Sequence, residues 1–179
     1  MAARVELRAL KPEDAAGLQA FRGANREFLR PWEPTRDESF YTLEAALEAI
    51  DVQQAECEAG RAYAFGIFDA GGLVGYVNLN AVVRGVFQNA YLGYAVAEKA
   101  NGRGYATEAV RAAVRIAFEE LGLHRVQAAV MPRNAGSIRV LEKAGFRREG
   151  LAEGYLLING TWEDHVLFAV TRDEYRSPQ

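Results

Sequence analysis

A glycine-containing segment between a predicted strand and a predicted helix has the residue types that bind an anion. Residues 101–107 read Asn-Gly-Arg-Gly-Tyr-Ala-Thr. The first turn of a helix has free N–H groups and the positive end of the helix dipole, so it can hold a phosphate group. Glycine lets the backbone approach the anion, and Arg103 adds a positive charge. The segment therefore predicts either a phosphate site or an ordinary tight strand-to-helix connection.

A second strand-to-helix junction follows at residues 131–137, which read Met-Pro-Arg-Asn-Ala-Gly-Ser. Asn134 is suited to cap the following helix, because its side-chain oxygen can accept a hydrogen bond from a free N–H group. Two helix N-termini after two neighbouring strands would form one cleft with phosphate and amide donors on its walls. The first junction is no Walker loop, since no Gly-Lys-Ser/Thr follows, and no Rossmann fingerprint, since the strands before it are predicted antiparallel.

The elements that must position these junctions follow from the spacing of apolar residues and from turn residues. Strands are predicted at residues 5–10, 63–68, 73–83, 88–96, 124–131, 146–157 and 161–170. Helices are predicted to begin at Lys11-Pro12 and to cover 42–59, 102–121 and 134–144. Asn159-Gly160 suits a type I′ turn in the last hairpin. The charged stretch 25–39 is predicted to be a long, functional loop. The order predicts a mixed α/β sheet covered by helices.

Length, composition and charge limit the classes of protein that this chain can be. With 179 residues, 50% of them hydrophobic, a single domain over 1–179 is expected. The 21 basic and 24 acidic residues give a net charge of −3, which argues against direct nucleic-acid binding and leaves room for a basic protein partner. No run approaches the ~18 apolar residues of a membrane span, and no signal peptide is evident. The single cysteine, Cys57, excludes an internal disulfide and a cysteine-rich metal site, so a cytoplasmic protein without metal is expected.

Three motifs resemble the Gcn5-related N-acetyltransferase (GNAT) superfamily: Gly102-x-Gly104-Tyr-Ala-Thr-Glu-Ala, Asn134-x-x-Ser137 and Leu141-Glu-Lys-x-Gly-Phe146. The order of predicted elements matches it as well. Further segments resemble the RimJ/RimL-type ribosomal-protein N-acetyltransferases, and most closely the RimJ branch. These segments are residues 25–39 with Pro31-Trp-Glu-Pro34, residues 82–85, residues 91–94 and residues 155–167. The resemblance implies a mostly antiparallel seven-stranded sheet, with helices on both faces and one splayed parallel strand pair.

The resemblance also implies a binding site for the co-substrate acetyl-CoA. Its pantetheine arm is expected between the strands that end at Val96 and Met131, with Val96 offering backbone groups and Asn134 a hydrogen bond. Its pyrophosphate is expected on the segment Asn101, Gly102, Arg103, Gly104, Tyr105, Ala106 and Thr107. Relatives usually have Gln or Arg three residues before the first motif glycine, where this chain has Lys99.

The implied reaction transfers an acetyl group from a thioester to an amine, which must be neutral to attack. An α-amino group has a pKa of about 7.7–8.0, so roughly a tenth is neutral at pH 7 and a strong base is less necessary than for a lysine. Ser137 matches the serine that relatives place near the thioester sulfur, and we expect it to donate to the leaving thiolate. Alternatively, Ser137 bonds a backbone group of its own helix. Leu141 occupies the register of the tyrosine that many relatives use as an acid.

The base and the acceptor site are less well defined by the sequence. Ala128, Ala129 and Leu156 stand where some relatives have a glutamate. Glu33, in the Pro-Trp-Glu-Pro loop, is the candidate base, acting directly or through water. A substrate-binding or solvated glutamate is the alternative for Glu33, and a structural asparagine is the alternative for Asn80. The expected substrate-binding residues are Trp32, Asn80 and Tyr155. Glu27, Glu33, Asp37 and Glu38 predict an acidic, aromatic mouth for an ammonium group and a basic tail. Both histidines, His124 and His165, are expected to be structural.

These expectations combine into an enzyme that acetylates the N-terminal alanine of a ribosomal protein, of the small subunit. The alternatives are an acetyltransferase of a small-molecule amine and a weakly catalytic acyl-CoA-binding adaptor. The missing glutamates favour the adaptor, whereas Ser137 and the glycine-containing segment oppose it. Either a monomer or a homodimer is compatible with the sequence.

Overall fold

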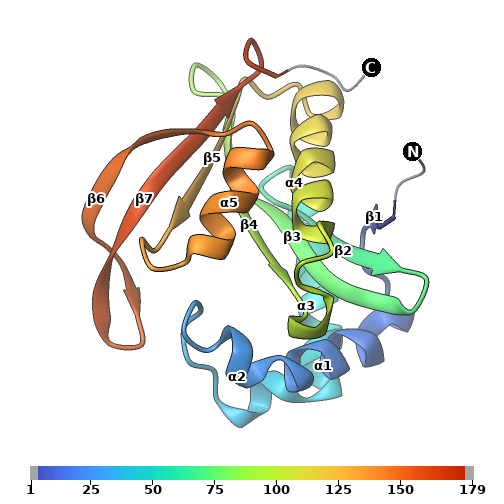
Figure 1. Ribbon diagram of the computed structural model, residues 1–179. Coiled ribbons are helices and arrows are strands. Elements are labelled where there is room, and N and C mark those ends of the chain that lie inside the picture. Colours follow the sequence, from blue (N-terminus) through green and yellow to red (C-terminus); the bar gives the residue numbers. More distant parts are fainter. Residues whose placement is uncertain (1–3, 176–179) are drawn as a thin grey trace.

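One seven-stranded sheet organises residues 4–175, the part of the chain that the computed structural model describes (Figure 1). The strands are β1 (Glu6–Arg8), β2 (Tyr63–Asp69), β3 (Gly72–Val83), β4 (Asn89–Val96), β5 (Arg125–Val130), β6 (Arg147–Ile158) and β7 (Thr161–Thr171). Their order across the sheet is β1-β2-β3-β4-β5-β7-β6. Within this sheet, β4 and β5 are the one parallel pair and all other neighbours are antiparallel. The predicted mixed, mostly antiparallel sheet is confirmed.

Helices cover both faces of this sheet. They are α1 (Ala15–Ala24), α2 (Arg26–Leu29), α3 (Leu43–Glu58), α4 (Tyr105–Arg115) and α5 (Ala135–Lys143). Two neighbouring residues of β2 belong to different hydrophobic cores. Ile67 belongs to the main core together with Val110 of α4, whereas Phe68 packs on a smaller core that contains Leu18 of α1 and Ile50 of α3. None of the described helices is long and apolar enough to cross a membrane.

The parallel pair is hydrogen-bonded only at its start. Its ladder joins Asn89, Ala90 and Tyr91 of β4 to residues 125–127 of β5, and within the described chain no further pair follows. Both strands nevertheless continue, to Val96 and Val130. Figure 1 shows them diverging, with α5 lying in front of the gap. The predicted splayed pair is confirmed, and it leaves an opening between two strand ends, each followed by a helix.

The helix predicted at 102–121 is shorter and less regular than expected. Gly102 and Gly104 have φ angles of +75° and +82°, which a right-handed helix does not accept, so α4 begins only at Tyr105. The α-helix ends at Arg115 and continues as a π-helical turn, Ile116–Glu120. Residues 101–104 are therefore loop, and the N-terminus of α4 lies directly behind them.

The N-terminal helical region also differs in detail from its prediction. The long loop expected at 25–39 contains the short helix α2, and it ends in a 3-10 turn, Glu38–Tyr41. Helix α3 begins after Thr42, whose hydroxyl oxygen accepts a 3.1 Å bond from the N–H of Ala45. The apolar residues at helical spacing in α3 are Leu43, Ala46, Leu47 and Ile50. Only Ala46 and Ile50 are buried, because a single i, i+4 row of the helix faces the sheet, whereas Leu43 and Leu47 are 46% and 38% exposed.

The last hairpin has the predicted turn and two unpredicted register shifts along β6, the first of them between Arg148 and Gly150. Asn159 and Gly160 have φ angles of +51° and +81°, as a type I′ turn requires. The register shifts between the pairs Ala152–His165 and Leu156–Glu163, where Gly154 is left-handed. A bulge at this point bends β6 and changes the direction of the side chains beside it.

Candidate active site

A cleft of about 790 Å³ lies where β4 and β5 separate. Its walls come from β3, β4, β5, the segment before α4, the first turns of α4 and α5, and the loop after α2. Of the residues predicted for the site, it brings together Trp32, Glu33, Asn80, Val96, Asn101, Gly102, Gly104, Tyr105, Ala106, Thr107, Asn134 and Ser137. Arg103 and Tyr155 are outside its lining. No group of three or more His, Cys, Asp or Glu side chains suited to a metal occurs within residues 4–175.

The segment before α4 offers a row of free backbone donors. The N–H of Glu108 makes the first bond of the helix, to the carbonyl of Gly104 at 3.1 Å. Among the hydrogen bonds of the described chain, none uses the N–H groups of 102–107. The N–H of Asn101 is already committed, because it donates to the carbonyl of Glu98 at 3.1 Å. The anion-binding amides therefore begin at Gly102, and Asn101 differs in this respect from its prediction.

Asn134 caps α5, and its amide keeps one group for a ligand. Its Oδ1 accepts a hydrogen bond from the N–H of Ser137 at 3.1 Å. This bond uses the side-chain oxygen, so the donor Nδ2 remains for a hydrogen-bond acceptor in the cleft. The predicted capping role and a binding role are thus compatible within one side chain.

Ser137 is hydrogen-bonded to a tyrosine that sequence reasoning gave no role. The hydroxyl of Tyr94 lies 2.8 Å from Ser137 Oγ and donates to the Ser137 carbonyl at 3.1 Å. Both residues line the cleft. Burial raises the pKa of Tyr94 to about 12, so its hydroxyl stays protonated at neutral pH. Alternation along β4 puts Tyr94 on the same face as Val96, which is the signal that could have identified it.

Glu33 is fixed by a second tyrosine. The hydroxyl of Tyr76, on β3, donates to Glu33 Oε1, while Oε2 takes part in no hydrogen bond within the described chain. Burial, followed by the nearby Glu33 charge, raises the pKa of Tyr76, so the phenol remains a donor. The ring of Tyr76 also packs edge-on against Phe21 of α1, with centroids 6.0 Å apart. Glu33 is thus a positioned carboxylate at the cleft rather than a freely solvated one.

His165, which was expected to be structural, lines the cleft as well. It is 4% exposed, and its Nδ1 lies 2.9 Å from the carbonyl oxygen of Glu163. Tyr155 packs against the His165 ring, with centroids 5.6 Å apart, so it lies behind the cleft wall rather than in the cleft. The β6 bulge, which local sequence patterns do not predict, sets this position.

The loop that carries Trp32 and Glu33 is tied to the turn of the last hairpin. Asn159 Oδ1 accepts from the N–H and from the hydroxyl of Thr35, both at 2.6 Å. Asn159 Nδ2 donates to the carbonyl of Arg30 at 3.1 Å. These three bonds bracket residues 30–35 and hold Glu33 against Tyr76. Contacts across more than a hundred residues of sequence carry no local signal, so Asn159 was predicted only as a turn residue.

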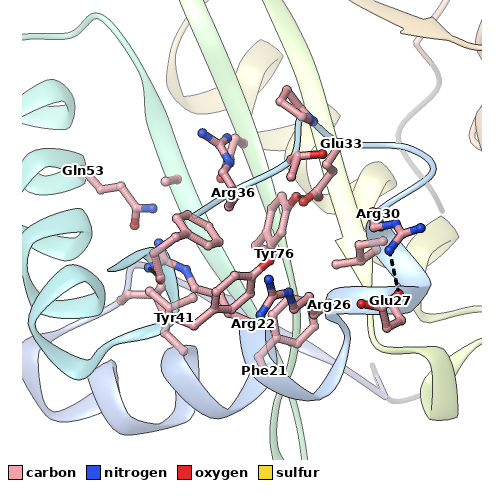
Figure 2. Close-up of a pocket in the computed structure, with 18 of the residues that line it drawn as sticks. Phe21, Arg22, Arg26, Glu27, Arg30, Glu33, Arg36, Tyr41, Gln53 and Tyr76 are labelled. Atoms are coloured by element: carbon pink, nitrogen blue, oxygen red, sulfur yellow. Dashed lines mark hydrogen bonds and ion pairs between the residues drawn. The ribbon is translucent and has the colours of Figure 1, made fainter. Parts of the chain in front are cut away.

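A second cavity of about 430 Å³ lies beside the cleft and is lined by residues of α1, α3 and the loop between them (Figure 2). The two cavities share Leu29, Glu33, Tyr76 and Asn78. We call the second one the arginine pocket, because its lining includes Arg22, Arg26, Arg30 and Arg36.

The arginine pocket corrects the predicted acidic mouth. Glu27 is paired with Arg30 at 3.2 Å and Glu38 with Arg26 at 2.6 Å. Asp37 accepts hydrogen bonds from Ser39. Two of the four acidic side chains are thus paired with arginines, and the cavity is lined by four arginines and two glutamates, so it presents more positive than negative charge.

Comparison with known proteins identifies the family and the fold. Residues 4–147 match the family described as "Acetyltransferase (GNAT) domain". The chain belongs to the GNAT acetyltransferase family. This acetyltransferase is 44% identical over 168 residues to the probable N-acetyltransferase YjcK of Bacillus subtilis, covering 93% of each chain. It is 38% identical over 174 residues to the [ribosomal protein uS5]-alanine N-acetyltransferase of Escherichia coli, covering 96% of this chain and 90% of the relative.

Solved structures agree with this family assignment. The ribosomal-protein-S5-alanine acetyltransferase of Vibrio fischeri superposes with a TM-score of 0.92 at 31% identity, covering 99% of this chain and 98% of that one. Mycobacterium smegmatis RimJ, in complex with CoA-disulfide, also superposes with a TM-score of 0.92, at 35% identity, covering 97% and 84%. The GNAT acetyltransferase described here is therefore an N-acetyltransferase of RimJ type, with the predicted fold.

Proposed function

We propose that this acetyltransferase transfers an acetyl group from acetyl-CoA to the N-terminal alanine of a ribosomal protein, in the cytoplasm. The observation that carries the proposal is the nearly full-length similarity to uS5-alanine N-acetyltransferases, which extends over the cleft and the Pro-Trp-Glu-Pro loop. On this basis we favour a small-subunit ribosomal protein as the acceptor.

Acetyl-CoA fits the donors of the cleft. The free amides from Gly102 to Thr107, at the N-terminus of α4, would hold its pyrophosphate. The gap between the ends of β4 and β5 would receive the pantetheine arm, with Asn134 Nδ2 as a donor to one of its carbonyl groups. Arg103 lies outside the cleft lining, so its contribution would be a long-range charge rather than a contact.

The chain would promote direct attack by the neutral amine. Acetyl-CoA supplies a thioester carbonyl carbon, to which the amine nitrogen forms a bond while the carbon–sulfur bond breaks. Glu33 Oε2 would accept the proton that the amine loses, directly or through water. The Ser137 hydroxyl would donate to the departing sulfur, and Tyr94 would in turn donate to Ser137 Oγ. Positioned donors at the atom where charge develops are an effective means of lowering the barrier.

A panel of acceptors tests the proposal. The protein is incubated with acetyl-CoA and with peptides that begin with Ala, Ser or Met, alongside spermidine and free amino acids, and thiol release is recorded. We expect turnover on the Ala peptide to exceed that on every small amine. Turnover confined to small amines would contradict the ribosomal acceptor, and coenzyme binding without any turnover would favour an adaptor.

One observation favours a small-molecule acceptor as the second candidate. The arginine pocket, at about 430 Å³, has the size of a pocket for a small ligand. The acceptor panel separates the two candidates, because a small-amine enzyme would not discriminate among the peptide N-termini.

A further inference from the structure

The arginine pocket contains two positive charges that lack an acidic partner. Arg26 and Arg30 are each paired with a glutamate, as described above. Arg22 and Arg36 have no carboxylate within ion-pair distance in the described part of the chain. Figure 2 shows both side chains in the lining of one cavity, with Tyr76 beside them.

Arg22 and Arg36 both lie over the ring of Phe40. The guanidinium carbons lie 4.0 Å and 5.0 Å from the centroid of the Phe40 ring. Burial, and then the neighbouring Arg36 charge, lower the pKa of Arg22. The charge of Glu33 acts on Arg22 in the opposite direction but more weakly, and its Oε1 is occupied by Tyr76. Like charges held together in a half-buried site are unfavourable unless an anion lies between them.

Arg22 is anchored so that part of its guanidinium remains available. Its Nη1 donates to the carbonyls of Phe40 at 3.1 Å and Ala45 at 3.4 Å. A guanidinium has five N–H donors, so Nε and Nη2 are left for a ligand. Arg36 is exposed and makes no hydrogen bond within the described chain, so its guanidinium donors are available to a ligand.

We propose that Arg22 and Arg36 bind a carboxylate of the acyl acceptor, on an acidic side chain within the first few residues after the acetylated one. This inference rests on the proposed peptide acceptor. The pocket and the cleft share Glu33 and Tyr76 in their walls, so a peptide whose amine lies beside Glu33 can extend toward the two arginines. Paired guanidinium groups match the planar, two-oxygen geometry of a carboxylate. Phosphate shares this chemistry and is distinguished in the test.

The test compares matched peptide acceptors. Peptides beginning with Ala carry Glu, Gln or phosphoserine at one position from the second to the fifth, and kcat/KM is measured for each. For one position we expect the Glu peptide to exceed the Gln peptide about tenfold. Arg36→Gln should abolish this preference. Arg22→Lys, which keeps the positive charge but not the two parallel N–H donors of the guanidinium group, should reduce it. Arg61→Gln, the loss of an exposed arginine paired with Glu56 outside both cavities, should retain it.

Two outcomes would overturn the inference. Equal kcat/KM values for Glu and Gln peptides at all four positions would contradict it, as would a Glu preference that survives Arg36→Gln. A phosphoserine preference that exceeds the Glu preference would replace the carboxylate with a phosphate.

Failure of the proposed function would be visible separately, because then no peptide would be acetylated. In that case, binding of N-acetylglutamate and of inorganic phosphate to the acetyl-CoA-loaded protein is measured by calorimetry. Binding that is lost in Arg36→Gln supports the anion site without a peptide acceptor, and absence of binding overturns it.

Discussion

The Tyr94 hydroxyl has one proton and two acceptors on Ser137, the carbonyl and Oγ. When Ser137 donates toward the cleft, Tyr94 can donate to Oγ and polarise the serine, which makes the two hydroxyls a chain. Tyr94→Phe should therefore lower kcat about threefold to tenfold, and Ser137→Ala should lower it by at least an order of magnitude. KM for acetyl-CoA should change little in Tyr94→Phe, as steady-state kinetics with a saturating peptide will measure.

The double variant provides the control for this chain. If Tyr94 acts through Ser137, adding Tyr94→Phe to Ser137→Ala should cost little more than Ser137→Ala alone. Fully additive losses would mean that Tyr94 acts elsewhere in the cleft.

The raised pKa of Tyr94 has a measurable consequence for the pH profile. A tyrosine whose pKa is raised keeps its proton to a higher pH, so the donor at Ser137 is lost only above about 12. The α-amine of the acceptor loses its proton at about 7.7–8.0. We expect kcat/KM to rise with pH through the pKa of the amine, to reach a plateau near pH 9 and to stay level to about pH 10. A decline between about pH 8.5 and 10 that disappears in Tyr94→Phe would contradict the assignment.

At the scale of elements, the hydrogen bonds between the last hairpin and the loop at 30–35 are expected to hold the acceptor site in its conformation. Asn159→Gly keeps the left-handed turn but removes three hydrogen bonds to Thr35 and Arg30. KM for the peptide acceptor should rise about threefold to tenfold, since Glu33 loses its support, while KM for acetyl-CoA stays constant. Asn159→Ala should add a loss of stability of about 1 kcal/mol, because alanine is strained at φ +51°. An unchanged peptide KM in Asn159→Gly would refute this role.

The segment before α4 has a second testable role at this scale, which is to hold the free amides in position for the pyrophosphate. Gly104 is left-handed, and a Cβ there would meet Arg4 Nη2 at 2.8 Å. Arg4 is a flexible, exposed side chain that can move, so the cost of Gly104→Ala is mainly backbone strain of about 1–2 kcal/mol. The substitution should displace the free amides and raise KM for acetyl-CoA about tenfold.

Gly23→Ala is the matched control for the added methyl group. Gly23 lies in α1, and its new Cβ would meet nothing within 4 Å. Alanine is favoured over glycine in a helix, so the melting temperature should rise slightly while both KM values stay constant. A similar KM change in the two variants would show that the effect is not specific to the segment before α4.

At the scale of the whole molecule, periodicity and turn residues predict all seven strands of this sheet. They succeed because each strand alternates or ends at a strong turn such as Asn159-Gly160. The motif residues on the two helix N-termini were predicted for the same reason, since Gly102, Gly104 and Asn134 carry their conformational preference locally. The bounds of α4 were wrong because left-handed glycines exclude helix, a property that apolar spacing does not report.

Relations between distant side chains could not be predicted from the sequence. Counting charges in residues 25–39 suggested an acidic surface. In the folded chain, Glu27 and Glu38 pair with neighbouring arginines, whereas Arg22 and Arg36 have no acidic partner among the described residues. Tyr76 and Glu33 meet only because β3 passes beneath the loop. Net charge describes solubility and long-range attraction, but it does not determine the sign of a particular cavity.

The short ladder between β4 and β5 also bears on how long the protein survives. The strand ladder between the N-terminal four strands and the C-terminal three has three residue pairs, and the gap beyond them is where the thioester substrate would lie. A ligand in that gap contacts both parts and stabilises the fold by RT ln(1 + [L]/Kd), about 2.7 kcal/mol at a hundredfold excess over Kd. Resistance to proteolysis would then increase with the concentration of acetyl-CoA. The enzyme would persist in cells with abundant acetyl-CoA and be degraded sooner in cells depleted of it.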